Sequence, residues 1–322
     1  MARAIPPPSD VVIDPVVTEG NESMPDQSTP RLNPLLDLLE ADKPVFTFWV
    51  NYYGLGSDYQ TAAAAQANPH YDFLLYDLEH QPYDVGQLRR FLWDLIDPAT
   101  LESQGRRAIK PVIVRLPAPG RERNEWMVKQ VLDAGVAGLM FPHIETPEEA
   151  LHAVAAARYP QKPGVADYLP EGRRGTSPAV PARYWGLEQA AYVQRSDIWG
   201  LDPDGNLLLI FIIETYRAVA NVRSIAKALS DAGVKAMLWA GGGDLSLSYG
   251  ELWYGGRDMT QTIAGIDAIL AAGKEFGLPV GMNDFGHVED DYHKGARGFF
   301  ALGPAALAGP PVSDEVRRAV GR

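Results

Sequence analysis

Polar side chains that could do chemistry follow apolar segments at several points of the sequence. The clearest case is Glu214, which comes directly after seven consecutive apolar residues, Leu207–Ile213. This run is too short to span a membrane and is rich in β-branched and aromatic residues, so it predicts a strand buried on both faces. Because an isolated buried charge is costly, the Glu214 carboxylate must be solvated, paired or bound to a metal.

Other predicted strands end in the same way, with a polar or aromatic side chain at the carboxyl end. These side chains are Trp49, Asp77 with Glu79 and His80, Arg115, His143 and Asp244. In parallel α/β folds the carboxyl ends of the strands meet on one face, and sites are built there. The sequence therefore predicts that these groups converge.

Glu214 and Asp244 together suggest a divalent cation. Two carboxylates, with water and substrate oxygens in the remaining positions, commonly hold Mg²⁺ or Mn²⁺. The alternative is that each carboxylate pairs with an arginine or caps a helix, since Thr215 and Asp244 stand where N-cap residues would. Gly241–Gly243 either turn backbone N–H groups towards an anion or form an ordinary tight turn.

Arg115 and His80 are the candidates for charge stabilisation and proton transfer. An arginine can clamp a carboxylate or stabilise an enolate, and its alternative is a structural ion pair. His80 lies three residues after Asp77, and a histidine oriented by a carboxylate is a competent acid or base near neutral pH. A structural role is the alternative for His80, for Glu79 as an ion-pair partner, and for His143.

The elements that must position these groups alternate between strands and helices. We expect strands at residues 44–50, 73–76, 111–114, 138–141, 207–213, 236–240, 279–282 and 298–301. We expect helices at 57–68, 85–96, 124–134, 146–157, 218–232, 260–276 and 312–320, with Thr146 as one N-cap. About eight such units favour a (β/α)8 TIM barrel of class α/β over a doubly wound sheet, and no GxGxxG or Walker loop supports the latter.

Two segments fall outside this alternation. Residues 1–33 are rich in Pro, Ser, Asp and Glu, and we expect a flexible N-terminal arm before a single barrel domain over residues 34–322. Residues 159–206 are dense in Pro and Gly, and a loop of this length predicts an inserted lid or an oligomer contact.

Composition excludes several classes of function. The chain has 322 residues, no Cys and a formal net charge of −12. The absence of Cys rules out disulfides and a cysteine nucleophile, and the acidic charge argues against nucleic acid or an anionic membrane as partner. With neither a signal-peptide core nor a transmembrane segment in view, we expect a cytoplasmic protein.

Several stretches together resemble one family. They are Phe73–His80, Val112–Arg115, Lys129–Pro142, Glu145–Ala150, Ile213–Thr215, Gly243–Ser246 and Gly295–Phe299. In this order they resemble the HpcH/HpaI aldolases, which are metal-dependent pyruvate aldolases of the phosphoenolpyruvate/pyruvate barrel superfamily. The resemblance extends over roughly residues 34–305.

The resemblance implies a (β/α)8 barrel that forms a homo-oligomer, a hexamer or trimer, with its last helix exchanged between subunits. It implies Mg²⁺ or Mn²⁺, with Co²⁺ also compatible, bound by Glu214 and Asp244 and chelated by a 2-oxo acid. Arg115 would stabilise a pyruvate enolate, and His80 paired with Asp77 would transfer protons. The backbone of Gly242 and Gly243 would hold the substrate carboxylate, with Trp49 lining the site.

The expected reaction is cleavage or formation of the C3–C4 bond of a 4-hydroxy-2-oxo acid, with an aldehyde as the other product or substrate. Alternatives are oxaloacetate decarboxylation, a C–C bond-forming synthase, or a barrel that binds a small acid without catalysis. The sequence departs from the family at Ile212, where glutamine is common, and at His143, where an apolar residue is usual. Aromatic residues hint at a bulky or aromatic aldehyde, with packing as the alternative: Tyr52, Tyr53, Trp253 and Tyr254.

Overall fold

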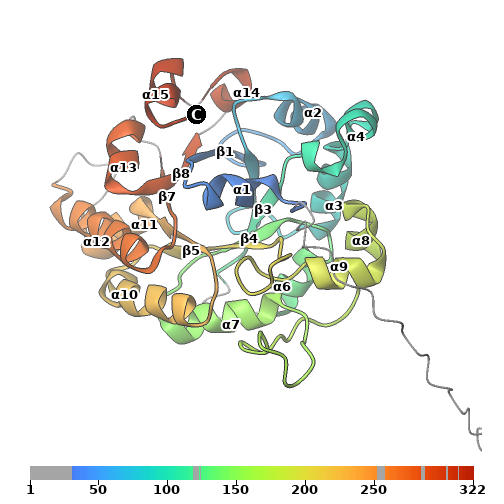
Figure 1. Ribbon diagram of the computed structural model, residues 1–322. Coiled ribbons are helices and arrows are strands. Elements are labelled where there is room, and N and C mark those ends of the chain that lie inside the picture. The colour runs from blue at the N-terminus through green and yellow to red at the C-terminus, as the bar shows by residue number, and fades with distance from the viewer. Residues whose placement is uncertain are drawn as a thin grey trace, which may run out of the picture.

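The chain folds into a closed barrel of eight parallel strands in sequential order, from β1 next to β2 round to β8 next to β1 (Figure 1). The computed structural model describes residues 31–118, 123, 125–251, 258–283, 287–301, 304–310 and 312–322. The strands are β1 Val45–Val50, β2 Phe73–Asp77, β3 Val112–Arg115, β4 Gly138–Phe141, β5 Leu208–Ile213, β6 Met237–Ala240, β7 Val280–Asn283 and β8 Ala296–Ala301. The predicted (β/α)8 barrel is confirmed.

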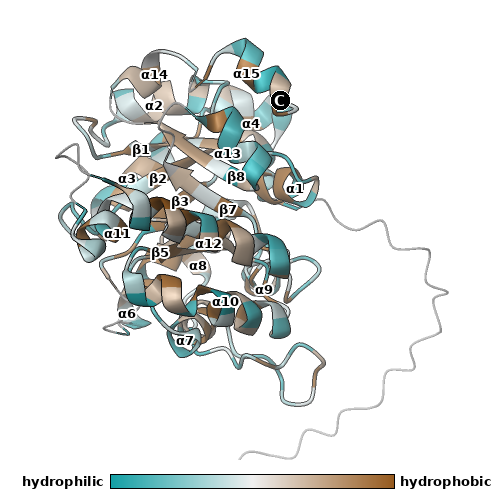
Figure 2. Cartoon of the chain, turned by 90° about the vertical axis from the view of Figure 1, so that its left-hand side faces the viewer, coloured by the Kyte–Doolittle hydropathy of each residue, from teal (hydrophilic) through white to brown (hydrophobic). Residues whose placement is uncertain are grey.

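Helices surround the barrel and connect its strands (Figure 1). They are α1 Pro34–Glu40, α2 Tyr59–Ala67, α3 Val85–Asp94, α4 Pro98–Gln104, η1 Arg106–Ala108, α6 Glu125–Leu132, α7 Pro147–Ala157, α8 Ala179–Trp185, α9 Gln189–Arg195, α10 Tyr216–Asp231, α11 Gly242–Tyr249, α12 Thr260–Phe276, α13 Val288–Lys294, α14 Ala305–Ala308 and α15 Asp314–Ala319. In Figure 2 the central strands are mostly hydrophobic, whereas the helices mix hydrophobic and hydrophilic residues.

Capping signals explain where several helices begin. Thr146 caps α7 in a capping box with Glu149, as predicted. Thr215 caps α10 by accepting a hydrogen bond from the N–H of Ala218. The predicted strands agree with the observed ones to within about two residues, but α4, α11, α13 and α14 were not expected.

The interior of the barrel is a hydrophobic cluster with the two-residue period of the strands. Its members include Val45, Trp49, Phe73, Leu75, Ile113, Met140, Leu208, Ile210, Ile212, Met237, Trp239 and Phe300. Gly281 allows Trp239 to lie across the interior, since an added Cβ at Gly281 would stand 2.1 Å from the indole. The same cluster includes Leu35 and Leu36 of α1 and Trp199, which close the amino-terminal end of the barrel.

The segment 159–206 also belongs to this amino-terminal end. It links the end of α7 to the start of β5, and Trp199 donates its indole N–H to Glu40 at the end of α1. Its residue Asn206 accepts from the backbone N–H groups of Leu32 and Asn33. This insertion therefore lies on the face opposite the strand carboxyl ends and is not a lid over them, while the alternative of an oligomer contact stays a prediction.

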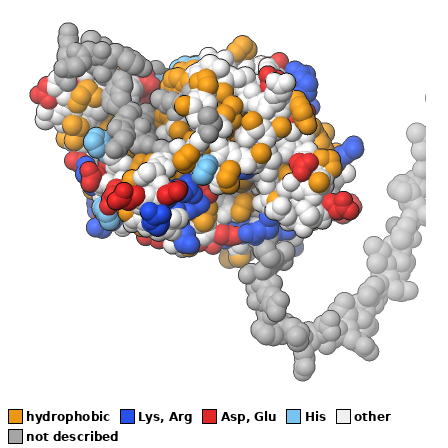
Figure 3. Space-filling model, turned by 90° about the horizontal axis from the view of Figure 1, so that it is seen from above, with side chains coloured by type: hydrophobic (Ala, Val, Ile, Leu, Met, Phe, Trp, Pro, Cys, Tyr) orange, Lys and Arg blue, Asp and Glu red, His pale blue; other side chains and the backbone are white. Residues whose placement is uncertain are grey.

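Acidic and basic side chains are interspersed with hydrophobic ones on the face in Figure 3, despite the net charge of −12. No helix in the described part of the chain is long and apolar enough to cross a membrane. Residues 1–30 of the predicted arm, together with Trp253 and Tyr254, lie outside the described residues.

Candidate active site

The alternation of side chains along the strands brings the predicted site residues to one layer at the carboxyl end of the barrel. A residue two positions after an inward-facing side chain also faces the interior. Leu75, Ile113, Ile212 and Trp239 belong to the interior cluster. The residues two positions further along are Asp77, Arg115, Glu214 and Gly241, and Trp49 lies in the same layer.

Arg115 is held on several sides and retains one free donor. Its Nε donates to Oδ1 of Asp77 at 2.6 Å, and its Nη1 lies 3.2 Å from Oε2 of Glu79. The guanidinium stacks over the Trp49 indole at 4.3 Å, which fixes its plane. Among the described residues, its buried Nη2 has no hydrogen-bond partner. A rigid arginine with one unpaired, buried N–H group is suited to an anionic ligand.

Asp77 accepts hydrogen bonds inside the barrel that hold Arg115 and the turn after β2 in place. Its fully buried carboxylate accepts from Arg115, from the N–H of Glu79 at 3.3 Å and from the N–H of His80 at 3.0 Å. Asn51 also pairs with the Asp77 backbone through two hydrogen bonds of 2.8 Å. The sequence predicted a contact between Asp77 and the His80 imidazole, but within the described residues their contact runs through the His80 backbone.

The imidazole of His80 is half-exposed and contacts Glu79. It stacks on Tyr52 with 5.9 Å between ring centroids, and its Nε2 lies 3.5 Å from Oε2 of Glu79. Partial burial lowers the pKa of His80, and the positive charge of Arg115 lowers it further. Histidine is therefore predominantly neutral here near pH 7, as a general base must be.

Glu214 is almost fully buried where β5 ends. Its Oε1 accepts the backbone N–H of His143 at 2.7 Å. The side chain packs against Gly241, where an added Cβ would stand 2.6 Å from the Glu214 Cβ. Burial raises the pKa of Glu214 to about 7, and the nearby Asp244 carboxylate raises it further, against the hydrogen bond from His143.

Asp244 lies in the first turn of α11, and Gly241 is the N-cap residue of that helix. The sequence-based alternative that Asp244 caps a helix is therefore wrong, as is the tight turn at Gly241–Gly243. The first N–H groups of a helix have no acceptor four residues earlier. Those of Gly242 and Gly243 are therefore available to an anion, and an added Cβ at Gly243 would meet nothing within 4 Å.

The two carboxylates of Glu214 and Asp244 lack a cationic side-chain partner. Among the residues that the structure describes, no Lys or Arg nitrogen lies within 4.0 Å of either. The His143 Nδ1 lies 3.6 Å from Glu214 and has no hydrogen-bond partner in the described chain. A buried carboxylate beside a solvent-exposed one, neither in an ion pair with a described Lys or Arg, fits the donor set of a hard divalent cation.

Glu79 and His143 belong to the site more closely than the sequence indicated. Glu79 is buried between Arg115, His80 and His143, whose Nε2 lies 3.9 Å away. Burial raises the pKa of Glu79 to about 7; Arg115 opposes this rise and Glu214 adds to it. His143 has a positive φ of 55°, uncommon for a non-glycine residue and typical of constrained functional positions. Its position at the end of a predicted strand and its departure from the usual apolar residue were the sequence signals.

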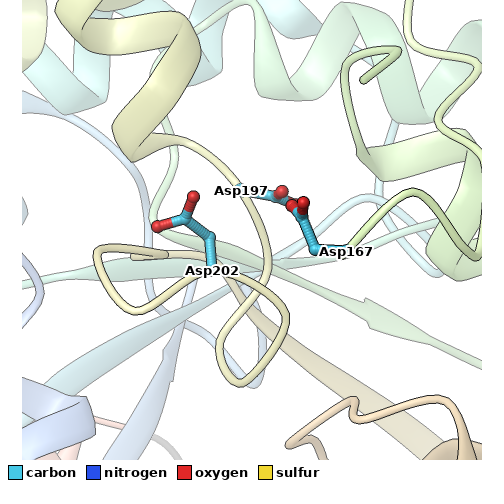
Figure 4. Close-up of side chains that lie close together, drawn as sticks. All are labelled: Asp167, Asp197 and Asp202. Atoms are coloured by element: carbon cyan, nitrogen blue, oxygen red, sulfur yellow. The ribbon is translucent and has the colours of Figure 1, made fainter. Parts of the chain in front are cut away.

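A second acidic cluster lies in the amino-terminal insertion, away from these residues. Ligand atoms of Asp167, Asp197 and Asp202 lie within 4.8 Å of one another (Figure 4). Arg158 is fully buried and donates to both oxygens of Asp197, at 2.9 and 2.6 Å. Two of the three carboxylates, Asp167 and Asp197, therefore have a cationic partner in Arg158, unlike Glu214 and Asp244.

Several known proteins are similar to this chain in sequence or in fold. The profile of the HpcH/HpaI aldolase/citrate lyase family matches residues 53–303. A hydroxypyruvate/pyruvate aldolase of Paraburkholderia phytofirmans is 35% identical over 250 residues, 78% of this chain and 82% of that protein. A 5-keto-4-deoxy-D-glucarate aldolase of Escherichia fergusonii is 30% identical over 66% of this chain and 68% of its own length.

A solved structure of the same family is also similar to this chain in fold. An HpcH/HpaI aldolase/citrate lyase family protein from Burkholderia cenocepacia superposes with a TM-score of 0.67 at 29% identity, covering 86% of this chain and 95% of that one. A citrate synthase at 21% identity and a TM-score of 0.61, covering 86% and 93%, shares the fold. The match spans most of the barrel and both of its carboxylate-bearing strand ends, and the chain belongs to the HpcH/HpaI aldolase/citrate lyase family.

Proposed function

We propose that the protein is a metal-dependent aldolase that cleaves or forms the C3–C4 bond of a 4-hydroxy-2-oxo acid through a pyruvate enolate. The observation that carries the proposal is the free Nη2 of the rigid, buried Arg115, together with the unpaired carboxylates of Glu214 and Asp244. Family membership and the names of the aldolase relatives support the reaction class.

Glu214 and Asp244 would hold the cation, Mg²⁺ or Mn²⁺, with Co²⁺ compatible with the same oxygen donors. When bound, a divalent cation acts as a Lewis acid towards the 2-oxo and carboxylate oxygens of a substrate. The pair supports this role because Glu214 is buried and no described Lys or Arg side chain forms an ion pair with either carboxylate.

Arg115 and the start of α11 would bind the substrate's oxygens. The Arg115 Nη2–H donates to the oxygen that carries negative charge in the enolate, and because its plane is fixed by Asp77 and Trp49 it needs no reorganisation. The N–H groups of Gly242 and Gly243 face the substrate carboxylate, where the helix dipole favours an anion.

His80 would transfer the proton. In the cleavage direction its imidazole accepts the proton of the C4 hydroxyl while the C3–C4 bond breaks, and that electron pair becomes the enolate. The aldehyde leaves, and the imidazolium returns the proton to C3, which gives pyruvate. A half-exposed, neutral imidazole on the rim supports this role.

The proposal is tested by pyruvate release from a panel of 4-hydroxy-2-oxo acids, with EDTA and then with added Mn²⁺ or Mg²⁺. The panel includes acids derived from hydroxypyruvate, since one relative bears that name, and oxaloacetate tests the decarboxylase alternative. We expect turnover only with metal. Turnover that persists after chelation would remove the metal from the mechanism.

The two acidic clusters can be separated in a Mn²⁺ titration. We expect Glu214→Ala and Asp244→Ala to abolish tight binding and activity. Asp202→Asn, in the amino-terminal cluster, is the matched control and leaves both unchanged. Loss of Mn²⁺ binding in the control alone would place the metal at the wrong end of the barrel for this mechanism.

A further inference from the structure

One turn after β2 carries two buried carboxylates whose surroundings differ. Asp77 accepts three hydrogen bonds, from the Arg115 Nε and from the N–H groups of Glu79 and His80. Its oxygens are occupied by partners that belong to the folded chain. A carboxylate held in this way fixes the turn and the arginine, and it has little capacity left for the imidazole.

Glu79 has the opposite character. Its Oε2 lies between the Arg115 Nη1 at 3.2 Å and the His80 Nε2 at 3.5 Å, and its Oε1 lies 3.9 Å from the His143 Nε2. These separations exceed those of short charge-assisted hydrogen bonds. The carboxylate is therefore enclosed but loosely bound, and the nearest imidazole nitrogen belongs to His80.

We propose that Glu79, rather than Asp77, is the carboxylate that orients the His80 imidazole and stabilises its protonated form. This inference rests on the proposed function. A neutral imidazole has one donor and one acceptor nitrogen. If Nε2–H donates to Glu79, Nδ1 is the atom that accepts the substrate proton, and the imidazolium carries both protons until Nδ1 returns one to C3. Glu79 is thus a positioning residue.

The groups that face Glu79 come from several elements. Arg115 and His143 face it from β3 and from the end of β4, Glu214 from the end of β5, and Asp77 from its own turn. Arg115 favours the ionised carboxylate, which is the form that supports a proton on the neighbouring His80 imidazole.

The test measures proton transfer without an aldehyde, as exchange of the pyruvate C3 protons with D₂O in the Mn²⁺-loaded protein. We expect Glu79→Gln to lower the exchange kcat about 10- to 100-fold, the range for losing a partner that orients a histidine. The KM for pyruvate and the Mn²⁺ affinity should stay within about twofold, so that the loss falls on kcat alone. Glu79→Asp should restore part of the rate.

Three further variants serve as controls for this test. Glu275→Gln, an exposed glutamate paired with Arg223, is the matched control and should leave exchange unchanged. In a His80→Ala background, Glu79→Gln should lower the rate no further, because Glu79 acts through the imidazole. Asp77→Asn should raise the KM for pyruvate, since Asp77 positions Arg115.

Three outcomes would overturn the inference. They are exchange by Glu79→Gln within twofold of wild type, additive losses in the His80→Ala background, and loss of Mn²⁺ affinity in proportion to kcat. A wild-type protein that exchanges pyruvate protons while Glu79→Gln matches it overturns this inference alone. A wild-type protein without metal-dependent exchange overturns the proposed function, and the inference with it.

Discussion

Arg158 at the amino-terminal end of the barrel and Arg115 at the carboxyl-terminal end both lie among carboxylates, and these two arginines are satisfied differently. At the amino-terminal end, all three nitrogens of Arg158 are hydrogen-bonded: Nε and Nη2 to Asp197, and Nη1 to the carbonyls of Asp167 and Pro170. At the carboxyl-terminal end, Arg115 is bound through Nε and Nη1 and keeps a buried Nη2 without a partner among the described residues.

This difference separates a structural ion pair from a binding site. A buried charge costs free energy unless its hydrogen bonds are made. Arg158 makes them within the chain, so the acidic residues around it need no ion. Arg115 and the Glu214–Asp244 pair leave theirs incomplete at the mouth of the barrel, and such uncompensated groups are most often completed by a ligand.

The largest difference between the two ends is expected when each arginine is replaced by lysine. Lysine keeps the positive charge but lacks the planar set of N–H donors of the guanidinium group. We expect Arg115→Lys to lower kcat for pyruvate exchange about 10²- to 10³-fold, as for loss of one donor to a developing oxyanion. Its melting temperature should change little, because a lysine can still pair with the buried Asp77.

Arg158→Lys should show the reverse. It leaves the carbonyls of Asp167 and Pro170 without their donor and removes the bidentate pair with Asp197. We expect the free energy of unfolding to fall by about 2–4 kcal/mol, the cost of buried groups left unpaired, with kcat unchanged in the folded fraction. Equal effects of the two substitutions on activity would refute the distinction between the two ends.

The sequence predicted the strands and their polar termini well, because a buried parallel strand is a continuous apolar run with an abrupt end. The sequence was also sufficient to predict on which face of the barrel residues 159–206 lie. In a (β/α)8 barrel, a segment that connects a helix to the next strand lies at the amino-terminal end of the strands. The contacts of Asp77 and Glu79 could not be predicted. Their spacing suggests a side-chain pair with His80, whereas the turn directs Asp77 to backbone N–H groups.

The unpaired carboxylates predict an unusual pH dependence for the metal-free protein. The pKa of Glu214 and that of Glu79 are each raised from 4.5 to about 7. For a carboxyl group with a raised pKa in the folded state, the unfolded chain loses its proton first as pH rises. Stability should therefore fall between pH 4.5 and 7, by up to about 3 kcal/mol for each of the two carboxyl groups, whose pKa values are each raised by two to three units.

Thermal unfolding of the EDTA-treated protein at pH 5 and pH 8 measures this slope. Glu214→Gln should flatten it, and added Mn²⁺ should raise the melting temperature at pH 8 more than at pH 5, because the cation binds the ionised carboxylates. The exposed Glu275→Gln keeps the wild-type slope. A metal-free protein that is more stable at pH 8 would mean that these carboxylates are compensated after all.

The smallest effects are expected at the glycines that begin α11. Substitutions at Gly241 and at Gly243 should have different effects. An added Cβ at Gly241 would stand 2.6 Å from the Glu214 Cβ and 2.9 Å from its Oε2, so Gly241→Ala must displace the carboxylate. At Gly243, nothing lies within 4 Å, and alanine there favours the helix by up to about 1 kcal/mol. We expect Gly241→Ala to weaken Mn²⁺ binding measurably, by about 10-fold, and Gly243→Ala to leave it unchanged while raising the melting temperature slightly. Equal Mn²⁺ affinity in both variants would mean that Glu214 is not a ligand, since only Gly241 limits the position of its side chain.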